Sequence, residues 1–155
     1  MILGCDPGLD GGLAIINGSE IELLETVPTE PKGGFIKRQV DAQKLSNILR
    51  VYPISVCYLE RVASRPGQGV GSVFSFGDTY GAIRGVLGAL NIPTYTIAPQ
   101  TWKKYWHLTS NKDESLDVAR MIWPEAPLKR KKDHGGAEAL LIADYWRQVH
   151  QGVKR

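Results

Sequence analysis

The alternation of hydrophobic and polar residues along the chain predicts five β-strands. Three short β-type stretches open the sequence, at residues 2–6, 12–16 and 21–27, and a glycine-rich turn separates the first two. Residues 54–59, ISVCYL, form a nearly continuous apolar run that is typical of a strand covered on both faces. Residues 93–98 are a further strand candidate. The first three strands are close enough in sequence to form an antiparallel meander.

Apolar residues at helical spacing predict helices between and after these strands. After a proline- and glycine-rich loop at 28–34, they recur at 40–49, at 73–90 and at 113–123, and a last helix is expected at about 134–149. This order of elements predicts an α/β domain in which a mixed sheet has helices on both sides.

The composition fits one compact domain that covers residues 1–155. With 155 residues and 43% hydrophobic content, the chain is long enough to bury a core. The first residues are already strand-like, without a signal or transit segment, and no apolar run reaches membrane-spanning length, so a soluble, cytoplasmic protein is expected. Cys5 and Cys57 lie in apolar runs without metal-ligand spacing, which favours buried, reduced thiols.

Two carboxylates are predicted at the ends of central strands. Asp6 ends the first strand, where the chain turns through Pro7 and Gly8, and Glu60 ends the fourth. Ligands and catalytic groups collect at the carboxyl ends of neighbouring strands, because side chains there stand clear of the helices. Together the two side chains could share a hard cation. Taken singly, Asp6 could be a turn former and Glu60 a strand end that meets solvent.

The closing segment KKDHGGAEALLIADYW adds a third acidic contribution. If Asp133 is the N-cap of the last helix, His134 and Glu138 lie one turn apart on a face that points at the sheet. A polar pair on a packing face is costly unless something binds it, and a metal would compensate. The alternatives are that His134 is structural and that Asp133 is a cap and not a ligand.

Asp6, Glu60, His134 and Glu138 together suit the cleavage of a phosphodiester. In-line cleavage uses one cation that activates water and a second that holds the leaving oxygen, with a bridging carboxylate, for which Asp6 is our choice. Two Mg²⁺ ions per site are therefore expected. The imidazole of His134 indicates that Mn²⁺ can substitute.

Positive charge is gathered in short groups, although the net charge is only +3. One group directly precedes the last predicted helix, and another follows Glu60 in the glycine-containing segment 61–71. Phosphate contacts of this kind give sequence-independent affinity for nucleic acid, whereas the alternative is a set of ordinary solvated faces. The residues expected to bind nucleic acid are Arg61, Arg65, Gln68, Lys103, Lys104, Lys129, Arg130, Lys131 and Lys132.

Glycines form a stripe in the long predicted helix. Gly77, Gly81 and Gly85 recur every four residues, and Gly88 lies just beyond. A glycine inside a helix costs roughly 1 kcal/mol relative to alanine, so the stripe indicates close approach by another backbone. That backbone is either the chain's own sheet or a symmetry-related helix in a homodimer.

Three segments resemble the RuvC-type Holliday-junction resolvases. They are GCDPGLDGGLAII, YLERV and KKDHGGAEALLIADY, and they follow the order of the family over nearly the whole chain. The stretch LKRKKDHGGAEALLIADY looks most like the plant chloroplast branch and its bacterial or phage relatives. DPG alone is a weak signal, whereas the closing motif is specific.

The resemblance implies a ribonuclease-H-like fold with a five-stranded sheet in the order 3-2-1-4-5, strand 2 being antiparallel. It implies metal-binding roles for Asp6, Glu60 and Glu138. His134 stands where many bacterial members have aspartate, and Asp133 is an alternative ligand there. Family members use lysines near the scissile phosphate, and among the candidates Lys103 and Lys112 we prefer Lys112, as a catalytic and DNA-binding residue.

The function implied is paired, symmetric, metal-dependent cutting of four-way DNA junctions by a homodimer during recombination and repair, in a bacterium or phage. One alternative is a nuclease for another branched DNA, such as a flap or fork, or for structured RNA. A second is a junction- or nucleotide-binding module that cuts nothing. Against the second, carboxylates repel phosphate unless a cation intervenes.

Overall fold

A mixed five-stranded sheet forms the centre of the molecule. The computed structural model describes residues 1–34, 37–64 and 66–150, apart from the side chain of Lys112. The strands run in the order β3-β2-β1-β6-β7, with β1, β6 and β7 parallel and β2 antiparallel to both of its neighbours. Since β6 and β7 are the fourth and fifth predicted strands, the expected order is confirmed. The strands are β1 (Ile2–Asp6), β2 (Gly12–Asn17), β3 (Glu20–Thr26), β6 (Val56–Glu60) and β7 (Thr94–Ile97).

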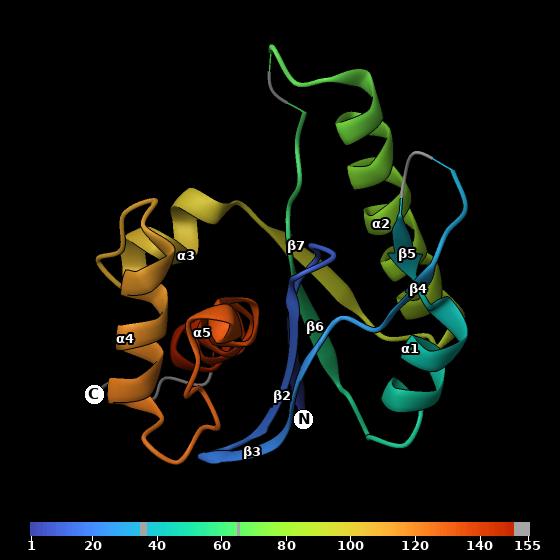
Figure 1. The fold of residues 1–155 in the computed structure, drawn as a ribbon. Helices are drawn as coiled ribbons and strands as arrows, with labels where there is room; N and C mark the ends of the chain where they lie inside the picture. The colour runs from blue at the N-terminus through green and yellow to red at the C-terminus, as the bar shows by residue number, and fades with distance from the viewer. Residues whose placement is uncertain (35–36, 65, 151–155) are drawn as a thin grey trace.

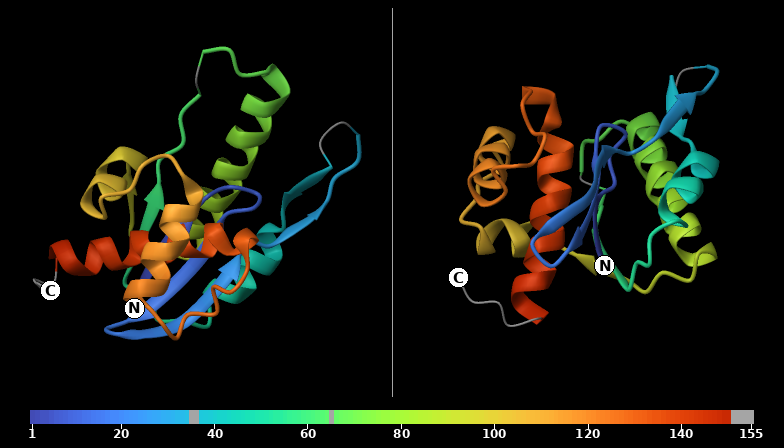
Figure 2. Two further views of the ribbon diagram at one scale, coloured as in Figure 1. Left: turned by 60° about the vertical axis from the view of Figure 1, so that its left-hand side comes forward. Right: turned by 90° about the horizontal axis from the view of Figure 1, so that it is seen from below.

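Helices cover both faces of this sheet (Figure 1). On one face lie α1 and α2, and on the other α5 packs directly against β1 and β2. The outer helix α4 packs on α5, which gives that side of the molecule a second layer (Figure 2). The helices are α1 (Ala42–Leu49), α2 (Val70–Ala89), α3 (Pro99–Tyr105), α4 (Lys112–Ile122) and α5 (His134–His150).

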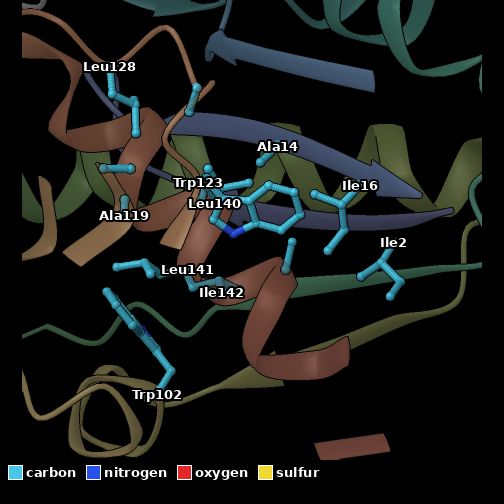
Figure 3. Close-up of a cluster of buried hydrophobic side chains, with 14 of the residues drawn as sticks. Ile2, Ala14, Ile16, Trp102, Ala119, Trp123, Leu128, Leu140, Leu141 and Ile142 are labelled. Carbon is cyan, nitrogen blue, oxygen red and sulfur yellow. The ribbon is translucent and has the colours of Figure 1, made fainter. Parts of the chain in front are cut away.

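The hydrophobic core is divided by the sheet into two clusters. Successive residues of β2 alternate between them, because neighbouring side chains on a strand point to opposite faces. Leu13 and Ile15 enter the cluster under α1 and α2, together with both free, buried cysteines, as the sequence predicts. Ala14 and Ile16 enter the cluster under α5, which Figure 3 shows with Trp102 at its edge.

Glycines let α5 lie unusually close to the sheet. A Cβ atom at Gly4 would overlap the backbone of Ala139, and one at Gly12 would overlap the backbone of Gly135. A Cβ atom at Gly135 would overlap the backbone of Asp10, in the turn between β1 and β2. The first turn of α5 is therefore held against the β1–β2 turn and the start of β2, which fixes the position of the residues that follow it.

A two-stranded ribbon occupies much of the region predicted as a loop at 28–34 and the residues after it. Its strands β4 (Thr29–Pro31) and β5 (Arg38–Val40) are antiparallel, and Asp41 caps α1 directly afterwards. Strands of three residues present too few side chains for a period-two pattern, so the sequence does not reveal them.

The long helix exposes large apolar residues at its start. It begins at Val70, three residues earlier than expected, and Phe74 and Phe76 in its first turns are 62% and 47% exposed. A Cβ atom on any glycine of the stripe would meet nothing within 4 Å. The chain's own sheet is thus not the close neighbour of this stripe, and that alternative is wrong.

The chain enters α5 through a short 3-10 turn, η1 (Lys131–Asp133). Asp133 closes this turn: its carboxylate accepts hydrogen bonds from the backbone N–H and the guanidinium of Arg130, at 2.8 Å each. The last helix begins at His134, as predicted, but the side chain of Asp133 caps η1 and not α5.

Among the described residues, no helix has the length and apolar character needed to cross a membrane.

Candidate active site

Three carboxylates from different elements line one cavity of about 750 Å³. Asp6 ends β1, Glu60 ends β6, and Glu138 lies in the second turn of α5. Because β1 and β6 are parallel neighbours, with Cys5 opposite Leu59, their carboxyl ends deliver the first two acids side by side. The structure therefore brings together three of the four residues predicted for the acidic centre.

Glu138 is nearly buried and carries a defined set of partners. Its side chain is 5% exposed, and the ammonium of Lys103 lies 2.9 Å from Oε1. The hydroxyl of Ser115 donates to the same oxygen at 3.2 Å. A charge in such a place needs both a counter-charge and hydrogen bonds, and α3 and α4 supply them.

Glu60 is held by Trp102, the residue of α3 that precedes Lys103. The indole N–H of Trp102, a fully buried side chain, donates to Glu60 Oε2 at 2.8 Å. Two consecutive residues of α3 thus bind two of the three carboxylates. Hydrogen bonds to a charged acceptor are stronger than neutral ones, so the indole holds this carboxylate in a fixed direction.

The carboxylates have the donor chemistry of a site for a hard divalent cation, which prefers oxygen ligands. Among the described residues, however, no three His, Cys, Asp or Glu side chains stand close enough together to form a ready metal site. The ammonium of Lys103 supplies the positive charge beside Glu138. A cation bound by Glu138 would therefore compete with Lys103 for this carboxylate.

His134 and Asp133 are not among the residues that line this cavity. His134 is the first residue of α5, one turn before Glu138. Its Nδ1 atom is buried and lacks a hydrogen-bond partner. Hydrogen bonds from Arg130, and its positive charge, hold the pKa of Asp133 below its usual range. The carboxylate of Asp133 is thus already neutralised by a cation of the chain.

The predicted nucleic-acid-binding residues divide into three groups. Arg61, Gln68 and Lys103 line the cavity. Lys104 and the basic run before α5 are exposed outside its lining. Arg65 and the side chain of Lys112 fall outside the described residues. The structure consequently places Lys103, the lysine that we preferred less, at the acidic centre. The basic run comprises Lys129, Arg130, Lys131 and Lys132.

Four further residues of the site were not predicted from the sequence. Trp102 and Ser115 bind the carboxylates, and Arg38 and Asp10 join the lining of the cavity. Trp102 is an apolar residue next to a lysine in a short segment after a strand, and this local sequence only weakly indicates a role in binding a carboxylate. Arg38 gives no signal, because the ribbon that carries it is not visible in the pattern.

A search of solved structures finds the same architecture in another protein. A chain described as T. thermophilus RuvC in complex with Holliday junction substrate superposes with a TM-score of 0.68, at 17% sequence identity, over 96% of both chains. The fold is that of RuvC. A second RuvC structure, from Thermus thermophilus, matches with a TM-score of 0.57 and 18% identity over 96% of both chains.

The likeness to RuvC confirms the predicted ribonuclease-H-like fold and extends over nearly the whole chain. At this level of identity it concerns the fold. No family model matches the sequence, and no curated protein matches it. The comparisons support a RuvC-type architecture and do not single out the plant chloroplast branch.

Proposed function

We propose that the protein is a metal-dependent endonuclease that resolves four-way DNA junctions by paired, symmetric cuts during recombination and repair. One observation carries this proposal. Asp6, Glu60 and Glu138 line a single cavity with Lys103, on a fold shared with a RuvC that was solved with a Holliday junction substrate. An acidic centre beside cationic side chains suits a phosphodiester only when divalent cations neutralise the carboxylates.

Asp6, Glu60 and Glu138 are the proposed metal ligands, with Asp6 between two Mg²⁺ ions. His134 is proposed as a fourth ligand, because its buried Nδ1 atom lacks a partner; Asp133 is less suited, because Arg130 already binds it. Bound cations would supply a metal-activated water and stabilise the leaving oxygen. An imidazole ligand is compatible with Mn²⁺ as a substitute.

The residues of the chain itself position the substrate. Lys103, released from Glu138, would place its ammonium beside a phosphate oxygen, and Lys112 is proposed for the same task. Arg61 and Gln68 line the cavity and would contact the strand that enters it. The exposed lysines before α5, together with Lys104 and Arg65, would add salt-dependent affinity for the duplex arms.

A homodimer is proposed on the outer face of α2. Val70 and Phe74, 87% and 62% exposed, continue the glycine stripe at spacings of three and four residues. Such spacing places them on one face of the helix. Open space above the glycines would allow a second helix to approach closely. The two-fold copy would place two cutting sites on one junction.

The dimer is tested by light scattering coupled to size exclusion. Phe74→Glu should convert dimer to monomer, because it introduces a charge at the centre of the contact. Val51→Glu is the matched control, since Val51 is 70% exposed on the loop after α1 and adds the same charge elsewhere. A wild-type monomer at all concentrations, or a dimer that survives Phe74→Glu unchanged, would refute this surface.

The domain extent, the localisation and the family branch are also proposed. We propose a single domain over residues 1–155 in the cytoplasm of a bacterium or phage-infected cell. The closing motif, LKRKKDHGGAEALLIADY, supports a particular relation to the plant chloroplast branch and its bacterial or phage relatives.

The deciding experiment offers the purified protein a mobile four-way junction, a flap, a fork and a linear duplex, each with Mg²⁺, Mn²⁺ or EDTA. Symmetric, metal-dependent cuts on the four-way junction support the proposal. Cuts mainly on the flap or fork would instead indicate a nuclease for other branched DNA. Binding without cutting under every metal would refute an enzymatic role.

Two variants test the residues. Asp6→Asn and Glu138→Gln should abolish cutting and preserve junction binding, because each removes a metal ligand and keeps the shape of the side chain. Glu22→Gln is the matched control, since Glu22 is an exposed acid on β3 outside the cavity. If either site variant cuts at the wild-type rate, that residue is not a ligand.

A further inference from the structure

The β4–β5 ribbon directs one arginine at the acidic cavity. Val40, at the end of β5, is buried in the core cluster under α1 and α2. Residues two apart on a strand face the same side, so Arg38 faces the body of the molecule as Val40 does. Arg38 is accordingly among the residues that line the cavity with Asp6, Glu60 and Glu138.

Arg38 is held there by an acid of the β1–β2 turn. Its Nη2 atom lies 3.0 Å from Oδ1 of Asp10, and Asp10 belongs to the turn that begins directly after Asp6. The side chains of Arg38 and Asp10 are 47% and 76% exposed, so the pair is surrounded by water. The ion pair links the ribbon to the β1–β2 turn at the edge of the cavity.

Such a pair is easily broken. Ion pairs between exposed side chains contribute little, because solvent screens the charges and two long side chains must be ordered. A phosphate is a stronger partner for arginine, since the planar guanidinium can donate two parallel hydrogen bonds to it. A DNA phosphate that reaches the edge of the cavity can therefore displace Asp10 from Arg38.

The ribbon itself is anchored independently of this pair. Val40 is buried in the core cluster under α1 and α2, and the backbone N–H of Asp41 donates to the carbonyl of Pro28 at 2.9 Å. These contacts keep β4 and β5 in place when Arg38 changes partner. The guanidinium can then move by rotation of its side chain alone.

We propose that Arg38 is a phosphate-binding residue which Asp10 holds at the edge of the cavity and releases to the DNA strand that enters it. The assignment rests on the proposed nuclease function and adds the ribbon to its substrate-binding surface. In the free protein, Asp10 satisfies the guanidinium and keeps it pointed at the entrance. In the complex, a backbone phosphate takes the place of the Asp10 carboxylate.

Binding of a fluorescent four-way junction, measured by anisotropy in EDTA over a series of salt concentrations, tests this exchange. Arg38→Ala should weaken binding about fivefold or more and lower the slope of log K against log salt by about 1, because one phosphate contact is lost. Lys44→Ala is the matched control: it removes an exposed cation of α1 outside the cavity and should leave both quantities unchanged.

Asp10→Asn should tighten binding by roughly two- to fivefold, the range expected when an exposed ion pair no longer has to be broken. The gain should be smaller in the Arg38→Ala background, where no guanidinium is released, and this difference is the coupling between the two side chains. If the Arg38–Asp10 pair only held the ribbon in place, Asp10→Asn would loosen the ribbon and weaken junction binding instead.

The outcomes separate the two proposals. If the wild-type protein cuts the junction and Arg38→Ala behaves like Lys44→Ala, or if Asp10→Asn weakens binding, the exchange is wrong and the nuclease assignment stands. If the wild-type protein neither binds nor cuts a junction, the nuclease assignment fails first, and the role of Arg38 fails with it.

Discussion

Replacing Lys103 by methionine separates the structural role of the acidic centre from its chemistry. Methionine keeps an unbranched chain of similar length and removes the ammonium that lies 2.9 Å from Glu138. Glu138 remains 5% exposed, with the Ser115 hydroxyl as its described neutral partner. The variant therefore leaves a nearly buried carboxylate without its counter-charge.

The expected loss of stability follows from this burial. Removing one partner of a fully buried ion pair costs about 3–5 kcal/mol. Lys103 is itself 20% exposed and Ser115 still donates, so we expect about 3 kcal/mol. In a domain of this size each kcal/mol lowers the melting temperature by about 2–4 °C, which predicts a decrease of about 6–12 °C for Lys103→Met in EDTA.

Divalent cations should reverse much of this loss. Lys103 no longer competes for Glu138 in the variant, so Mg²⁺ or Mn²⁺ should raise its melting temperature more than that of the wild type. A ligand at about one hundred times its Kd stabilises the folded state by about 2.7 kcal/mol, which is close to the predicted loss. The added mutation Glu138→Gln should remove the effect of the cation, because it deletes the ligand.

Thermal unfolding followed by circular dichroism, with and without each cation, measures the melting temperatures of the wild type and the variants and their shifts on cation binding. Lys104→Met is the matched control, since Lys104 is the next residue of α3 and is exposed; it should melt within about 2 °C of the wild type. A Lys103→Met variant that also melts within this margin would refute the energetic reasoning. Equal cation-induced shifts in the wild type and Lys103→Met would refute the competition for Glu138.

Three further predictions concern the surroundings of the site. Gly135→Ala should destabilise the protein by about 2–3 kcal/mol in urea unfolding, because a Cβ atom there overlaps the β1–β2 turn. The Arg130 guanidinium holds the pKa of Asp133 below its usual range, so this carboxylate stabilises the fold at neutral pH and the contribution disappears as pH falls through the lowered pKa. Asp133→Asn should therefore flatten the dependence of unfolding free energy on pH in the acid range, below about pH 5, where this carboxyl begins to take up a proton in the unfolded chain. Burial raises the pKa of the Cys5 and Cys57 thiols, so both should react with a thiol reagent only on unfolding, and rapid labelling of the native protein would contradict this.

The parts of the fold that the sequence predicted are those with long, regular patterns. The five strands of the main sheet and the last helix carry continuous apolar runs or a helical stripe, and the structure places them where the pattern does. The short ribbon at 29–40 and the earlier start of α2 at Val70 carry no such pattern. Backbone pairing and a glycine-rich entry determine these two features, and neither depends on hydrophobic periodicity.

The acids of the candidate site were predictable from their local sequence, whereas for its cations the sequence suggested Arg61 and Lys103 and gave no sign of which acids they meet. Asp6 and Glu60 follow strand ends, and Glu138 lies on a packing face, so each is visible from its local sequence. The partner of Glu138 is 35 residues away in sequence, and Arg38 meets Asp10 across 28 residues. Such pairs depend on how α3 packs on α5 and how the ribbon packs on α2, which no local pattern encodes.

The short helix α3 sets the spacing of the acidic centre. Successive residues of a helix point about 100° apart, so a helix whose consecutive residues Trp102 and Lys103 bind Glu60 and Glu138 must lie between β6 and α5. Trp106, after the last turn of α3, also donates to the carbonyl of Leu141 in α5 at 3.0 Å. Glu60 is thus held by a neutral indole, whereas Glu138 is held by an ammonium. If the proposed cations bind, Glu138 is therefore the carboxylate that would have to exchange a charged partner, Lys103, for the metal.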